Sequence, residues 1–122
     1  MMNVLVLAAN DDVRFIVSSV LRRHGDTVLE AVSEREATEA ASRFEAPIQI
    51  LVMDLDSKTA EALAFGRRLM QERTETRVLF ISGHRKEHFG FELAGMESTP
   101  VAFLEKPFVP KDLFAAIATL TG

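Results

Sequence analysis

Short apolar segments alternate with amphipathic helical patterns from one end of this chain to the other. The apolar runs are found at residues 3–7, 27–31, 48–53, 77–81 and 101–105. Between them, apolar side chains recur every three or four residues, which is the spacing of one face of an α-helix. Strands joined by helices in this way pack as a parallel sheet. The sequence therefore predicts an α/β fold, a doubly wound five-stranded parallel sheet with helices on both faces.

The ends of the helices are indicated by capping residues and by loss of periodicity. Asp11 or Asp12 can cap the first helix, and Gly25 is suited to end it. The third helix is expected over residues 59–72. Periodicity is poor over residues 84–100, where we expect a short or irregular helix followed by a loop.

Length and composition narrow the classes of protein. The chain has 122 residues, and we expect one domain over residues 1–122. Hydrophobic residues make up 48% of it and the net charge is −4, so neither a disordered chain nor a nucleic-acid-binding protein is expected. No apolar stretch approaches the roughly 20 residues of a membrane-spanning helix. With no cysteine and no signal peptide expected, we predict a cytoplasmic protein without disulfides.

Three of the predicted strands end on polar residues. Asp54 closes the third strand, Ser82 follows the fourth, and Lys106 follows the fifth. Because the carboxyl ends of parallel strands meet at one edge of a sheet, a carboxylate, a hydroxyl and an ammonium are expected together there. The first strand brings only Ala8 and Ala9 to the same edge. The sequence therefore predicts a functional site around Asp54 to which the first strand contributes no acid.

These strand ends resemble those of the receiver domain of two-component response regulators. The resemblance spans essentially the whole chain, and it implies the flavodoxin-like receiver topology. In the segments around the fourth and fifth strands it is closest to receivers of hybrid sensor histidine kinases. The motifs that carry it are Met53-Asp54, Ile81-Ser82-Gly83, Phe103-Leu104-Glu105-Lys106-Pro107-Phe108 and, after the first strand, Val13-Arg14.

The resemblance implies a role for each residue at this edge. Asp54 would be the phosphoacceptor, taking a phosphoryl group from a phosphohistidine of a histidine kinase or phosphotransfer protein. Lys106 would pair with Asp54 and then with a phosphoryl oxygen, while Ser82 would hydrogen-bond another oxygen. Phe103 would be an aromatic switch residue, although its residue type alone favours a core aromatic. The peptide bond before Pro107 is a candidate for the cis form.

The chain departs from the family directly after the first strand. The family places two acids there, which hold magnesium together with the phosphoacceptor, but here those positions are Ala8 and Ala9. Methyl groups supply no oxygen ligand. Asp11 lies further along, and Asp56 either brings a replacement carboxylate close to Asp54 or faces solvent. We therefore expect at most weak magnesium binding, through Asp54, Asp56 and Asp11, and slow phosphorylation.

Three classes of function remain open. The first is a signal-transduction receiver that accepts a phosphoryl group at Asp54 with an impaired magnesium site. The second is a pseudo-receiver, a protein-interaction module that acts independently of phosphorylation. The third, a nucleotide- or flavin-binding protein, is disfavoured because acids in the loop after the first strand repel phosphate. In the first two classes we expect no enzymatic activity. We also expect an output partner, which the sequence does not identify, and homodimer formation is possible.

Overall fold

The computed structural model describes residues 1–55, 59–84 and 101–121, which include five strands and four helices. The strands are β1 (Asn3–Leu7), β2 (Thr27–Ala31), β3 (Ile50–Asp54), β4 (Arg77–Ser82) and β5 (Val101–Glu105). The helices are α1 (Asp11–His24), α2 (Glu34–Arg43), α3 (Thr59–Glu72) and α4 (Pro110–Thr121). The third strand was predicted over residues 48–53, but β3 begins at Ile50, two residues later. The irregular helix predicted within residues 84–100 lies, from residue 85 onward, outside the described residues.

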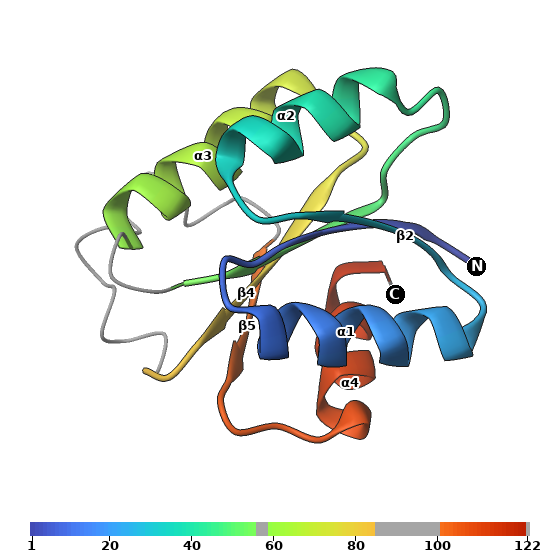
Figure 1. The fold of residues 1–122 in the computed structure, drawn as a ribbon, viewed down its shortest axis with the longest axis vertical. Helices are drawn as coiled ribbons and strands as arrows, with labels where there is room; N and C mark the ends of the chain where they lie inside the picture. Colours follow the sequence, from blue (N-terminus) through green and yellow to red (C-terminus); the bar gives the residue numbers. More distant parts are fainter. Residues whose placement is uncertain (56–58, 85–100, 122) are drawn as a thin grey trace.

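All five strands are parallel and form one sheet in the order β2-β1-β3-β4-β5. Helices α1 and α4 lie on one face of the sheet, and α2 and α3 lie on the other (Figure 1). Each face has its own buried apolar cluster, as expected for a parallel sheet covered on both sides. The doubly wound fold predicted from the sequence is confirmed. No helix of the described part is long and apolar enough to cross a membrane.

Local signals explain where α1 begins and ends. The side chain of Asn10 accepts a hydrogen bond from the backbone N–H of Val13 at 3.0 Å, so Asn10 is the N-cap. The sequence had suggested Asp11 or Asp12 for this position, but both lie in the first turn, where their charge favours the helix dipole. Gly25 ends the helix in the left-handed conformation with φ of 100°, as predicted.

The register of the strands fixes which residues meet at the carboxyl edge of the sheet. Leu7 of β1 pairs with Met53, and Asp54 of β3 pairs with Ile81. One strand further, Ser82 pairs with Glu105. The ends of β1, β3, β4 and β5 are therefore level, and the residues that follow them share one edge.

A close approach between α3 and the sheet explains one glycine. A Cβ atom on Gly66 would lie 3.0 Å from the ring of Phe80 and 3.5 Å from the sulfur of Met53. Phe80 is fully buried, so its ring has little room to withdraw. Gly66 thus allows α3 to pack directly on β3 and β4.

We predict that Gly66→Ala lowers the free energy of unfolding by about 1 kcal/mol. The better helix propensity of alanine offsets only part of the overpacking against Phe80. Chemical denaturation measures the change. In a Phe80→Leu background, where the ring edge is gone, the same substitution should become neutral or stabilising; an unchanged penalty there would show that the ring is not its cause.

Candidate phosphoacceptor site

Asp54 is a buried carboxylate with a charged partner. It ends β3, and only 4% of its side chain is exposed. The Nζ atom of Lys106 lies 2.9 Å from its Oδ1 atom, while the lysine side chain is about one-third exposed (32%). The approach lacks hydrogen-bond geometry, and Oδ1 has no hydrogen-bond donor among the described residues. The ammonium of Lys106 is therefore the partner that the described residues supply to this buried oxygen.

Lys106 is placed by the end of β5 and by the turn after it. Its backbone N–H donates to the carbonyl oxygen of Ser82 at 2.7 Å, which continues the pairing of β4 with β5 by one residue. The peptide bond between Lys106 and Pro107 is cis, as the resemblance implied. The backbone hydrogen bond to Ser82 holds the main chain of Lys106, and its side chain reaches Asp54 across the end of β4.

Ser82 lies at the end of the intervening strand β4. Its side chain is buried, and its hydroxyl accepts a hydrogen bond from the backbone N–H of His84 at 2.9 Å. Because this hydroxyl acts as acceptor in that bond, its proton can still be donated to another oxygen. The described contacts place Ser82 at the same edge as Asp54 without joining the two side chains. Its role toward a phosphoryl oxygen stays a prediction.

Phe103 packs as an aromatic of the sheet. It pairs with Phe80 across β4 and β5, and the two ring centroids are 5.2 Å apart. Its half-buried ring belongs to the apolar cluster on the α2 and α3 side. This position agrees with the core interpretation, and a switching role for Phe103 remains a prediction.

The two alanines follow the end of β1. Ala8 is buried and directly follows Leu7, the partner of Met53, so continuing the register places Ala8 opposite Asp54. Ala9 is exposed. Asp56 lies outside the described residues, so the sequence-based alternatives for it stay open.

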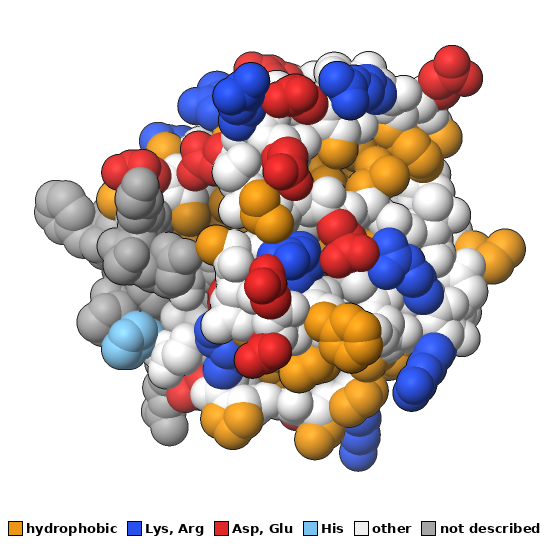
Figure 2. Space-filling view, viewed as in Figure 1, with side chains coloured by type: hydrophobic (Ala, Val, Ile, Leu, Met, Phe, Trp, Pro, Cys, Tyr) orange, Lys and Arg blue, Asp and Glu red, His pale blue; other side chains and the backbone are white. Residues whose placement is uncertain are grey.

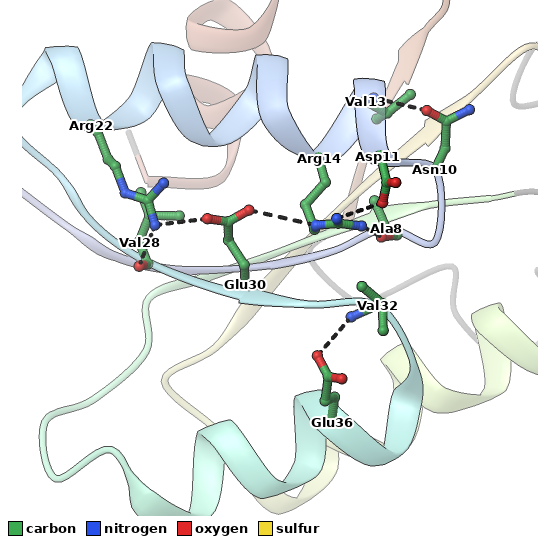
Figure 3. A network of polar contacts seen from close by, with 10 residues as sticks. All are labelled: Ala8, Asn10, Asp11, Val13, Arg14, Arg22, Val28, Glu30, Val32 and Glu36. Atoms are coloured by element: carbon green, nitrogen blue, oxygen red, sulfur yellow. Dashed lines mark hydrogen bonds and ion pairs between the residues drawn. The ribbon is translucent and has the colours of Figure 1, made fainter.

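Asp11 is engaged elsewhere, in a polar network that the sequence analysis did not foresee (Figure 3). The guanidinium of Arg14 binds Asp11 at 2.6 Å and donates to the carbonyl oxygen of Ala8 at 2.8 Å. Glu30 of β2 lies 3.6 Å from Arg14 and 2.9 Å from Arg22. The spacing of Asp11 and Arg14 by three residues was the available signal for the first contact. The network directs Asp11 toward Arg14.

The described residues do not fit a magnesium site built from several carboxylates. Within residues 1–55, 59–84 and 101–121, no three His, Cys, Asp or Glu side chains are grouped closely enough to hold a metal ion. At the carboxyl edge, Asp54 is already paired with an ammonium, and the residue that follows β1 there is Ala8, which offers no oxygen from its side chain. Magnesium requires several oxygen ligands in near-octahedral arrangement.

The fold and the strand-end residues agree with comparisons to known proteins. The family model for the response regulator receiver domain matches residues 4–118. This chain belongs to the response regulator receiver family. No curated protein sequence matches it significantly.

Solved receiver structures superpose over nearly the whole chain. The chemotaxis protein CheY4 of Vibrio cholerae has a TM-score of 0.82 at 21% identity and covers 98% of both chains. A response regulator from Thermotoga maritima has a TM-score of 0.83 at 20% identity, covering 100% of this chain and 99% of its own. The receiver domain of the hybrid histidine kinase CckA has a TM-score of 0.69 at 26% identity, covering 98% of this receiver and 99% of its own chain.

We predict that Lys106→Met lowers the free energy of unfolding by about 1–3 kcal/mol, because the buried Asp54 carboxylate loses its counter-charge. The upper limit is modest since the lysine is partly exposed and screened. Denaturation at neutral pH measures the effect. The double variant Asp54→Asn, Lys106→Met should recover most of the loss, and the exposed Lys111→Met serves as control. Equal losses in the single and double variants would contradict a stabilising ion pair.

Proposed function

We propose that this receiver accepts a phosphoryl group on Asp54 and acts as a signalling domain, not as an enzyme. The observation that carries the proposal is the 2.9 Å ion pair between Lys106 and the buried Asp54 at the carboxyl edge of the sheet. A carboxylate oxygen is the nucleophile that formation of an acyl phosphate requires. The adjacent ammonium is the kind of partner that a phosphoryl oxygen requires.

The transfer follows from this geometry. An oxygen of Asp54 attacks the phosphorus of a phosphohistidine on the donor protein, so that an O–P bond forms while the P–N bond breaks. The bonding electron pair leaves with the imidazole nitrogen of the donor. The product is an aspartyl phosphate with about two negative charges. Lys106 then exchanges its carboxylate partner for a phosphoryl oxygen, and Ser82 donates its hydroxyl proton to another.

The transfer is proposed to be slow and only weakly dependent on magnesium. A magnesium ion is present with CheY in the CheX-CheY-BeF3 complex of Borrelia burgdorferi, a receiver 16% identical with a TM-score of 0.81, covering 99% of this chain and 90% of its own. In the present chain Ala8 and Ala9 supply no ligands. Loss of about 4 kcal/mol of charge stabilisation slows transfer roughly a thousandfold.

The donor is proposed to be a histidine kinase or a phosphotransfer protein in the cytoplasm. The similarity to the CckA receiver and the segments around Ser82 and Lys106 support a relationship with hybrid kinases. An output protein is expected to recognise the face formed by β5 and α4, because Lys106 directly joins this face to Asp54.

A second candidate function is favoured by Ala8 and Ala9, the two residues that replace the magnesium-binding acids. If Asp54 is never phosphorylated, the domain is a pseudo-receiver whose binding face is fixed by the Asp54–Lys106 pair. The two candidates differ in one respect: only the first requires the carboxylate of Asp54 to react.

We predict that Ala8→Asp, Ala9→Asp creates magnesium binding and accelerates phosphorylation of Asp54 by acetyl phosphate about a hundredfold or more. Wild type should bind magnesium more weakly than low millimolar. Magnesium titration followed by NMR of the amides around Asp54 measures affinity, and phosphate incorporation measures the rate.

The same double substitution in an Asp54→Asn background serves as the matched control and should remain unlabelled. Low-millimolar or tighter magnesium binding by wild type would contradict the proposed impairment. Absence of labelling of wild type by every histidine donor tested, together with unchanged partner binding by Asp54→Asn, would favour the pseudo-receiver.

A further inference from the structure

The outer face of α1 carries an unusual apolar patch. Among the exposed large hydrophobic side chains of the described residues, only Phe15 and Ile16 lie on a helix, and they are 70% and 50% exposed. Figure 2 shows apolar side chains on the front of α1, with acidic groups toward its start and basic groups toward its end. Adjacent exposed apolar side chains on a helix often mark an interaction surface.

The charges on α1 indicate which kind of surface packs there. Asp11 and Arg14 bind each other, Arg22 binds Glu30, and His24 contacts the buried Asp26 at 3.0 Å. Two charged side chains of this helix, Asp12 and Arg23, have no ion pair with any described residue. Both are exposed.

These two charges and the apolar patch share one face. At 3.6 residues per turn, Asp12, Ile16, Ser19 and Arg23 follow one another along one side of α1, and Phe15 lies beside them. Ser19 is half-buried, and the other four are exposed. Along the helix, the stripe therefore consists of an acidic, an apolar, a small and a basic side chain. Ser19 leaves space where Phe15 and Ile16 project.

A stripe of this composition is complementary to itself in the antiparallel direction. When two copies of α1 pair about a two-fold axis between Val17 and Ser18, Asp12 and Arg23 lie at equal distances from the axis on opposite sides. Asp12 of each copy then meets Arg23 of the other, and Ile16 meets Ser19. A two-fold interface requires this self-complementarity.

We propose that this protein forms an antiparallel homodimer through α1, held by two Asp12–Arg23 ion pairs around a centre of Phe15 and Ile16. This inference does not depend on phosphorylation of Asp54. One helix face buries less area than a standard interface of roughly 1,600 Å², so we expect a weak dimer with a dissociation constant on the order of 100 µM. Salt should weaken it, because the ion pairs are exposed at the rim.

Charge reversal tests the pairing directly, with sedimentation analysis of the full chain as the measurement. Asp12→Arg and Arg23→Asp should each weaken self-association about tenfold or more, because each converts two attractive pairs into repulsive ones. The double variant, and an equimolar mixture of the two single variants, should both regain dimer formation. Phe15→Ser should weaken association in every background.

Matched controls separate the proposal from general charge effects. Glu45→Arg and Arg67→Asp reverse exposed charges away from α1 and should leave the dissociation constant unchanged. Circular dichroism verifies that each variant is folded.

Three results would overturn the proposal. The first is a monomeric wild type at about ten times the expected dissociation constant. The second is a dissociation constant of the dimer that the charge reversals leave unchanged, or that the double variant does not restore. The third is loss of binding to a histidine-containing helical bundle by the α1 variants with self-association unchanged, which would assign the face to another protein.

Discussion

The ion pair between Asp54 and Lys106 sets a demanding constraint on the fold. Their strands, β3 and β5, are separated by β4, so the two backbones are about 10 Å apart. A contact across this distance requires a long side chain that starts at the same edge of the sheet. Asp54 pairs with Ile81 and Ile81 with Leu104, so Lys106 lies two residues beyond the level of Asp54. The backbone bond from Lys106 to Ser82 then fixes the point from which the lysine starts.

The missing acids change the electrostatics around this pair. A receiver edge with three carboxylates has excess negative charge, which a divalent cation balances. Here one carboxylate meets one ammonium, and the adjoining Ala8 methyl adds no charge. The unmodified site is therefore close to neutral among its described groups. In the proposed transfer, an incoming phosphoryl group meets less repulsion but also finds fewer groups that stabilise the transition state, and the second effect is the larger.

The parallel α/β architecture could be predicted from periodicity, and the gathering of Asp54 and Lys106 at one edge from the rule for parallel strand ends. The strand order and the direct pairing of these two residues followed from the resemblance to receivers. The N-cap of α1 was predicted wrongly, since Asn10, Asp11 and Asp12 are all good capping residues and only the backbone decides among them. The Arg14 network was not predictable in full. Its link to Glu30 joins a helix to a neighbouring strand, and side-chain direction across that contact is not encoded in local spacing.

The network also has a consequence for the surface of α1. It engages Asp11, Arg14 and Arg22 with one another or with Glu30, and His24 contacts Asp26, so Asp12 and Arg23 are the α1 charges that make no ion pair with the described residues. The buried face of α1 packs on the sheet, while its other face carries the exposed Phe15 and Ile16. The edge with Asp54 and the start of α1 are joined by the short segment from Ala8 to Asn10.

The most direct measurement of the central claim is chemical trapping of the acyl phosphate. Incubation with a phosphorylated histidine donor, reduction with borohydride and peptide mass spectrometry convert a phosphorylated aspartate into homoserine and locate it. The account predicts homoserine at position 54 in wild type and a strongly reduced amount in Lys106→Met. Homoserine at a different carboxylate, or an equal yield at position 54 without the lysine ammonium, would contradict it.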